Sequence, residues 1–199
     1  TDPSRAHPAE RRRLIILANM HKQPVVEALR HFRPWLEQRA NVVAEQDTSQ
    51  MSMEQAGSLP AADLAIVLGG DGTMLAQARV LSERDLPLLG INFGKVGFLA
   101  EFTLDAVKSH WDSIIGGTCP TSTRMMVEVL VYPRGSPEWG NGALPAPLFH
   151  FLAMNDAVIT AGAPYRMVEI ELAIEPSVSH ASATTFIGDG VIVATPAGS

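Results

Sequence analysis

The chain has 199 residues, of which 46% are hydrophobic and 18% are charged, and its formal net charge is −6. This composition excludes a disordered chain and a coiled coil, and the acidic balance argues against binding to nucleic acid. No apolar stretch approaches the roughly 20 residues that cross a membrane, so we expect neither membrane nor nucleic acid as a partner. The single cysteine, Cys119, excludes an intrachain disulfide, and with the polar start of the chain it favours a cytoplasmic location.

The first half of the chain alternates short apolar runs with segments of helical spacing. We expect buried strands at residues 14–18, 41–44, 64–68 and 87–91. Helices are expected where apolar residues recur every three or four positions, from Val25 to Leu36 and from about Thr73. Pro34 should kink or split the first helix, and residues 46–60 read as a loop. Strands that alternate with helices predict a parallel, doubly wound sheet, which is the α/β fold class.

After about residue 120, one strand-like run follows another without helical spacing. These runs are Met125–Tyr132, Phe149–Thr160, Met167–Ile174, Phe186–Ile187 and Val191–Ala194, with a long loop expected at 133–147. The pattern predicts an antiparallel, β-rich second domain. We therefore divide the chain into a polar N-terminal extension, 1–12, an α/β domain, 13–119, and a β-rich domain, 120–199. Because the chain stops in a turn directly after a strand, we expect the second domain to be incomplete.

The strongest local signal is Gly69-Gly70-Asp71-Gly72-Thr73, a glycine turn between a buried strand and a helix. Glycines let a ligand approach the backbone, and the free N–H groups and dipole of a helix start favour a phosphate. An aspartate repels phosphate, so Asp71 suits a hydroxyl or a metal better, and its ionised form can accept a proton. The alternative interpretation, that Asp71 only caps the helix, fits the local sequence equally well.

Other well-known signatures are missing from the sequence. Lys95 lacks the spacing of a Walker loop, and Leu75 stands where the dinucleotide-binding fingerprint has its third glycine. The six histidines and the one cysteine show no metal-ligand spacing, and the nucleophile elbow of the α/β-hydrolases is not present. The glycine–aspartate turn is therefore the main clue to function.

Three later segments carry polar or loop residues in unusual places. Gly94-Lys95-Val96-Gly97-Phe98-Leu99 presents Phe98 in a loop, where it could stack on a base or fill the core, and spacing favours the core. Asn155 and Asp156 interrupt an apolar strand, either as buried groups with partners or as a solvated strand end. Gly188-Asp189-Gly190 precedes a strand that ends in Thr195-Pro196-Ala197-Gly198-Ser199, and Asp189 by itself reads as a turn residue.

Taken in order, these segments resemble NAD kinase, the enzyme family that makes NADP from NAD and a nucleoside triphosphate. The resemblance lies in Gly69–Leu75, Gly90-Ile91-Asn92 with Gly97-Phe98-Leu99, Asn155-Asp156, and Gly188–Gly190 with Thr195–Ser199, and it covers nearly the whole chain from residue 14. It implies an α/β N-terminal domain and a β-rich C-terminal domain with the active site between them. One motif alone would also fit lipid kinases or phosphofructokinases, whereas four in order are specific.

The resemblance also implies roles for individual residues. Asp71 would accept the proton of the adenosine 2′-hydroxyl of NAD, the turn backbone would hold phosphates, and Phe98 would lie near the adenine. The residues implied in binding nucleotide are Gly69, Gly70, Gly72, Thr73, Phe98, Asn155, Asp156, Arg166, Asp189 and Ala197. The chain departs from the family pattern at Ala197, often serine or threonine, and at Ile187, an arginine in some members. The family also continues after Ser199 into further substrate-binding residues.

The implied reaction is phosphoryl transfer from ATP or another donor, with Mg²⁺ bridging the triphosphate and no metal held by the protein alone. Family members commonly form dimers or tetramers, so a homo-oligomer is the expectation. Two rival hypotheses are a lipid kinase of the diacylglycerol type, which shares the turn but continues differently after Leu75, and a non-catalytic dinucleotide-binding module. NADP product, phospholipid product, or binding without product would distinguish the three.

Overall fold

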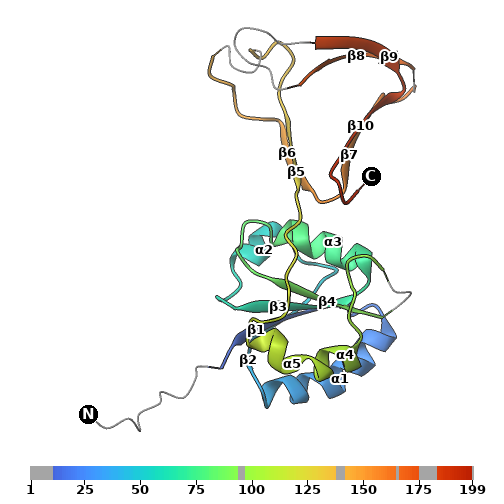
Figure 1. Cartoon of the computed structure of the whole chain (residues 1–199). Helices are drawn as coiled ribbons and strands as arrows, with labels where there is room; N and C mark the ends of the chain where they lie inside the picture. The colour runs from blue at the N-terminus through green and yellow to red at the C-terminus, as the bar shows by residue number, and fades with distance from the viewer. Residues whose placement is uncertain (1–10, 94–96, 138–141, 165, 175–182, 199) are drawn as a thin grey trace. The chain divides into compact units, whose positions relative to one another are not determined.

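The computed structural model describes residues 11–93, 97–137, 142–164, 166–174 and 183–198 (Figure 1). Most of the predicted polar extension, 1–12, lies outside these residues, as do Gly94, Lys95, Val96 and Ser199 of the predicted motifs. The chain divides into two compact units, Thr1–Ser122 and Thr123–Ser199, here called unit 1 and unit 2.

In the described residues of unit 1, five helices cover a parallel sheet of four strands. The strands are β1 (Arg13–Ala18), β2 (Asn41–Asp47), β3 (Leu64–Gly69) and β4 (Leu88–Asn92). The helices are α1 (Gln23–Glu37), α2 (Met53–Gly57), α3 (Asp71–Val80), α4 (Leu104–Ser109) and α5 (Trp111–Ile115). The strands lie in the order β2-β1-β3-β4, all parallel, which confirms the predicted α/β class. Within the described residues, no helix is long and apolar enough to cross a bilayer.

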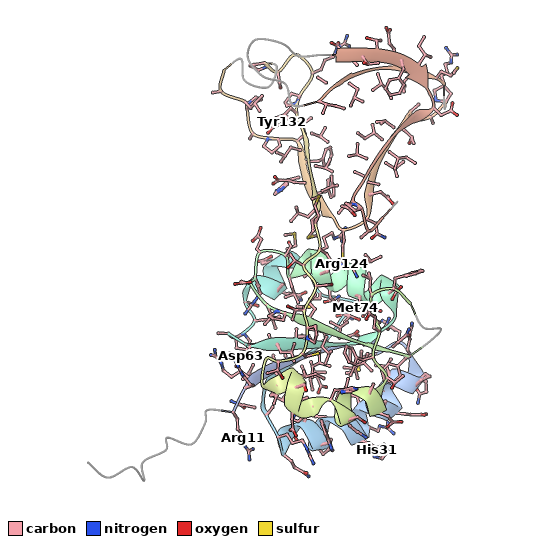
Figure 2. All side chains as sticks on the ribbon, viewed as in Figure 1. Arg11, His31, Asp63, Met74, Arg124 and Tyr132 are labelled. Atoms are coloured by element: carbon pink, nitrogen blue, oxygen red, sulfur yellow. The ribbon has the colours of Figure 1, made fainter. Side chains whose placement is uncertain are left out.

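Alternate residues of the buried strands point to opposite faces of this sheet. Leu14 and Ile16 pack with α1, α4 and α5 on one face, and Ile15 and Leu17 pack with α2 and α3 on the other. Figure 1 shows the two helical layers, and Figure 2 labels Met74 of α3 between its helix and the sheet. Helices on both faces make the sheet doubly wound, and they explain why its strands are continuous apolar runs in the sequence.

Two local predictions for unit 1 need correction. Residues 46–60 are not one loop, because α2 begins at a capping box in which the Ser52 and Gln55 side chains each accept the other's backbone N–H. Helix α1 is not split at Pro34. The Gln38 N–H donates to the Pro34 carbonyl at 3.3 Å, so the helical hydrogen bonding continues past the proline.

Unit 2 consists of antiparallel strands, with no helix among its described residues. The strands are β5 (Val127–Val131), β6 (Phe149–Ala153), β7 (Asp156–Thr160), β8 (Val168–Ala173), β9 (Ala183–Gly188) and β10 (Gly190–Ala194). They pair as β5 with β6, β7 with β10, and β8 with β9. The predicted β-rich region is confirmed. The single strand predicted at 149–160 is wrong, because it breaks at Met154 and Asn155 into β6 and β7.

Unit 2 buries far less apolar surface than unit 1. Every buried hydrophobic side chain in the described part of the chain lies in unit 1. In unit 2, Val158, Ile159 and Ile192 stand on paired strands, and yet each is more than half exposed. Thr195 is the buried exception, with 2% of its surface exposed. The order of unit 2 therefore rests on strand pairing and on contacts such as those of Thr195.

Candidate functional site

The strand order creates a change of direction between β1 and β3. Strand β1 leads into α1 on one face of the sheet, and its neighbour β3 leads into α3 on the other face. In open α/β sheets, ligands bind beyond the carboxyl ends of the strands at such a point. Residues 19–22 follow β1 here, and the glycine turn 69–72 joins the end of β3 to the start of α3. The sheet thus brings the strongest sequence motif to the position where a ligand is expected.

Backbone hydrogen bonds hold the segments at this edge of the sheet in place. The Asn19 N–H donates to the Leu68 carbonyl at 3.1 Å, which ties the turn after β1 to the end of β3. The Phe93 N–H donates to the Gly69 carbonyl at 2.9 Å, which ties the end of β4 to the same strand. Helix α3 begins at Asp71, two residues before the predicted start. Three connections therefore meet around the glycine turn.

The three glycines of the turn differ in what surrounds them. A β-carbon on Gly69 would collide with the Thr73 side chain, so packing alone requires glycine there. A β-carbon on Gly72 would meet no atom within 4 Å, and one on Gly70 would meet only the Lys22 Nζ, at 3.8 Å. Alanine is more favourable than glycine within a helix by about 1 kcal/mol. The fold therefore gives no reason for glycine at position 72, whereas a ligand lying against the backbone does.

The carboxylate of Asp71 is fastened to the segment that follows β4. Its Oδ2 accepts a hydrogen bond from the Phe98 N–H at 2.8 Å, and its Oδ1 accepts those of Leu99 at 3.2 Å and Ala100 at 3.0 Å. A β-carbon on Gly97 would overlap with this carboxylate. The alternative that Asp71 only caps its helix is wrong, because the side chain joins two segments far apart in the sequence.

These hydrogen bonds determine the electrostatic state of Asp71. The Ala100 N–H is the largest cause of a pKa below the ordinary aspartate value; burial opposes it, and the Phe98 and Leu99 N–H groups add to it. A carboxylate has about four lone-pair positions, and described residues fill three of them, which leaves one position on Oδ2 without a partner in the described part of the chain. Asp71 is thus a fixed, ionised carboxylate that can accept one further hydrogen bond.

Phe98 lies beside this carboxylate and not in the core. Its side chain is 88% exposed. The interpretation favoured by spacing alone, in which Phe98 fills the core, is therefore wrong. The ring is available to a ligand, and its backbone N–H is one of the three that hold Asp71.

In unit 2, the turn between β6 and β7 is fastened to the segment after β10. The Thr195 N–H donates to the Asn155 carbonyl at 2.7 Å, and the Thr195 hydroxyl donates to the Met154 carbonyl at 2.7 Å. A β-carbon on Gly198 would overlap with the Asn155 backbone. The predicted segments around Asn155 and around Thr195 are therefore in contact, although Met154 and Thr195 are 41 positions apart in the sequence. The exposed Asp156 is the first residue of β7 and lies next to this contact.

The other two predicted residues of unit 2 lie elsewhere. Asp189 stands between β9 and β10, and its carbonyl accepts a hydrogen bond from the Ala161 N–H at 3.3 Å. The exposed Arg166 precedes β8, which begins opposite the last residue of β9. Asp189 is next to Gly190, which pairs with Thr160 at the last residue of β7. Asp156 is the first residue of that strand, four residue steps or about 14 Å away. The structure therefore groups the predicted residues of unit 2 in two places.

Known proteins resemble the chain over most of its length. Residues 32–119 match the family model of the ATP-NAD kinase N-terminal domain. The NAD kinase of Geobacter metallireducens is 35% identical over 195 aligned residues, which cover 94% of this chain and 63% of that protein. The NAD kinase of Syntrophotalea carbinolica is 42% identical over 144 residues, covering 72% of this chain and 46% of that protein. Residues 32–119 of this chain thus match the N-terminal domain of the NAD kinase family, and the relatives that extend the likeness are NAD kinases.

A solved structure shares the fold of this chain. The crystal structure of yeast NADH kinase complexed with NADH matches it with a TM-score of 0.69, over 96% of this chain and 56% of that one. At 18% identity, the likeness concerns the fold alone. The chain spans less than two thirds of the length of the NAD kinases described above.

The two departures from the NAD kinase pattern are both accessible. Ala197 is exposed in the turn after β10, and Ile187 of β9 is 67% exposed. Neither residue is therefore required by the packing of a core.

Sequence analysis missed two features of the site. The first is the set of backbone N–H groups that hold Asp71, for which the small residue Gly97 was the only signal. The second is Lys22, whose ammonium group lies beside Gly70. Its signal was a lysine just before a helix, at the carboxyl end of the first strand.

The described side chains of the site do not form a resident metal centre. Within the described residues, no group of three or more histidines, cysteines, aspartates or glutamates could hold a metal ion. Asp71, the acidic residue of the turn, already accepts three N–H groups. This donor set suits a divalent cation that arrives on the phosphates of a nucleotide, as Mg²⁺ commonly does.

Proposed function

We propose that the protein transfers a phosphoryl group from ATP to the adenosine 2′-hydroxyl of NAD, which gives NADP. The observation that carries the proposal is the Asp71 carboxylate at the start of α3, held by three N–H groups and left with one acceptor position beside a glycine turn. The relatives described above support it, since they are named NAD kinases and an NADH kinase.

The phosphates of the donor would lie against the glycine turn. The start of α3 supplies free N–H groups and the positive end of a helix dipole, and both favour an anion. Gly70 and Gly72 leave the backbone uncovered, while Gly69 and Thr73 pack together and shape the turn. Mg²⁺ would be part of the substrate, bound to the triphosphate, where it neutralises charge.

Asp71 would act on the hydroxyl of the acceptor. The ribose oxygen attacks the γ-phosphorus, the bond from that phosphorus to the ADP oxygen breaks, and the hydroxyl proton passes to the Asp71 carboxylate. A lowered pKa makes Asp71 a weak base. The loose transition state of phosphoryl transfer, however, requires the hydroxyl to be oriented more than to be strongly deprotonated. A fixed, ionised carboxylate meets that requirement.

The predicted residues of unit 2 would bind NAD. Asn155 and Asp156 lie at the turn that Thr195 fastens, with Ala197 in the adjoining segment. Asp189 lies at the other end of the β7–β10 pair, and Arg166 precedes β8, the partner strand of β9. Since four residue steps of β7, about 14 Å, separate Asp156 from the end of the strand pair where Asp189 lies, these two residues would contact different parts of the dinucleotide. Phe98, exposed beside Asp71, would stack on the adenine.

Two further properties of the protein belong to this proposal. A homo-oligomer, dimer or tetramer, and a cytoplasmic location are both expected from the family. A lipid kinase is less well supported, because the relatives described above act, by their names, on NAD or NADH. A non-catalytic dinucleotide-binding module would have no use for a carboxylate held so specifically at the turn.

The direct test is product formation by the full-length protein. The protein should be incubated with ATP, Mg²⁺ and NAD, and NADP should be measured with an NADP-specific dehydrogenase. A diacylglycerol substrate serves as the second arm, and binding of NAD by calorimetry as the third. Formation of NADP supports the proposal, whereas phospholipid product, or NAD binding without product, would overturn it.

A further inference from the structure

We propose that the ammonium group of Lys22 binds the phosphates of the phosphoryl donor, opposite Gly70 and across the change of direction between β1 and β3. This inference rests on the proposed function and adds a donor-binding residue from outside the four motifs that resemble the family. It begins from one distance: the Lys22 Nζ lies 3.8 Å from the point that a β-carbon on Gly70 would occupy.

The backbone holds Lys22 at this place. The Lys22 N–H donates to the Asn19 carbonyl at 3.1 Å, and the Asn19 N–H donates to the Leu68 carbonyl of β3 at 3.1 Å. The Lys22 carbonyl in turn accepts the N–H groups of Val25 and Val26 in the first turn of α1. The turn after β1 is thus tied to both β3 and its own helix, so the lysine stem starts from a defined point beside the glycine turn.

The ammonium group of Lys22 has no interaction partner within the described part of the chain. The side chain is exposed, and its ammonium group makes no hydrogen bond or ion pair with any described residue. Asp71, the acidic residue of the neighbouring turn, takes its hydrogen bonds from the backbone of the segment after β4. A cation with no partner among the residues that the structure describes is available to an anionic ligand.

The position of Lys22 also contradicts the usual rules for a helix start. Lys22 is the N-cap of the 15-residue helix α1, where serine, threonine, aspartate or asparagine is preferred, and its side chain makes no capping hydrogen bond. The first turn of α1 contains no acidic residue, so a positive charge lies at the positive end of a helix dipole without compensation. Local rules are expected to fail at functional sites, and a bound phosphate would remove this conflict.

The charged and dipolar groups around Lys22 and Gly70 favour a phosphate as the ligand. Lys22 stands at the start of α1, and Gly70 precedes the start of α3, so the positive ends of two helix dipoles and one ammonium group share this end of the sheet. Gly70 presents no side chain to the ammonium group, which leaves room for a phosphate oxygen between them. The positive charge of Lys22 would also offset the repulsion between a phosphate and Asp71.

The test compares Lys22→Met with Lys22→Arg, and uses Lys108→Met as a matched control. Lys108 is also an exposed lysine of unit 1, but it lies in the last turn of α4. In the full-length protein, Lys22→Met should raise the KM for ATP about tenfold or more and leave the KM for NAD within a few-fold, since a hydrogen bond to a charged group is lost. Lys22→Arg should recover most of the loss, and Lys108→Met should match the parent.

Two further measurements separate this proposal from the proposed function. Calorimetric binding of inorganic tripolyphosphate, which needs no turnover, should weaken in Lys22→Met by a similar factor. The melting temperature of that variant should be unchanged or higher, because an unfavourable charge leaves the helix start. Failure of the parent to make NADP would overturn the proposed function, while unchanged ATP and tripolyphosphate affinities in Lys22→Met would overturn the role of Lys22.

Discussion

The Oδ2 of Asp71 and the backbone N–H of Phe98 are 2.8 Å apart, although 27 positions separate the two residues in the sequence. Together with the N–H groups of Leu99 and Ala100, this bond fixes the carboxylate at the start of α3 and keeps it ionised. Among the described residues, none fills the remaining acceptor position on Oδ2. The same residue therefore stabilises the fold of unit 1 and presents a charge for chemistry, and the two roles can be separated by experiment.

The first prediction concerns Asp71→Asn in the full-length protein. Turnover should fall by at least ~10²-fold while NAD binding stays within a few-fold, because the proton acceptor is lost. The unfolding free energy should also fall, by about 1–3 kcal/mol, since one backbone N–H loses its acceptor. Asp85→Asn, at an exposed carboxylate away from the turn, is the control. Near-normal turnover in Asp71→Asn would remove Asp71 from catalysis.

The second prediction uses two glycines of the site that differ in their surroundings. Gly72→Ala should keep or raise the melting temperature, because no atom lies within 4 Å of the new β-carbon, but should weaken ATP binding at least tenfold, because that carbon covers the backbone at a helix N-terminus. Gly97→Ala should lower the melting temperature, because its β-carbon overlaps the Asp71 carboxylate. Gly57→Ala, with open space around it, is the control. Normal ATP affinity in Gly72→Ala would contradict the phosphate site.

The third prediction concerns the two groups of NAD-binding residues in unit 2. Asp156→Ala and Asp189→Ala should each weaken NAD affinity more than ATP affinity, measured by calorimetry. Because the residues lie at opposite ends of the β7–β10 pair, the free-energy changes of the two substitutions should add in the double variant within about 0.5 kcal/mol. Unchanged NAD affinity in both single variants would contradict the assignment, and strong coupling would contradict their separation.

The fourth prediction is a loss of stability of unit 1 in acid. Hydrogen bonds from backbone N–H groups, chiefly that of Arg13 for Asp63 and that of Ala100 for Asp71, lower the pKa of both carboxyls. A lowered folded-state pKa contributes stability that is present above the ordinary aspartate value, about 3.9, and is lost as the pH falls through the folded value. Urea unfolding below about pH 4 should therefore show a steep decline that Asp63→Asn and Asp71→Asn make shallower and Asp85→Asn does not. Equal slopes in all variants would refute it.

Much of unit 1 could be predicted from the sequence because its strands are covered on both faces. Residues 14–18 and 64–68 are unbroken apolar runs, and they became β1 and β3 almost without change. Helix α2 was not predicted because it is short and has no run of apolar residues at helical spacing. It begins at a capping box of polar residues. The break between β6 and β7 was not predicted for another reason. Hydrogen bonds from Thr195, about 40 positions later in the chain, help to hold the turn at Met154 and Asn155.

The glycine turn followed by a helix was determined by the sequence itself, because glycine spacing and a helix start depend on neighbouring residues. The partners of Asp71 and the place of Lys22 were decided only by the tertiary structure. They depend on the strand order β2-β1-β3-β4, which brings the carboxyl ends of β1, β3 and β4 to one edge of a parallel sheet. Residues 22, 71 and 98 lie at this edge because each follows one of these strands. The local sequence does not determine which strands become neighbours.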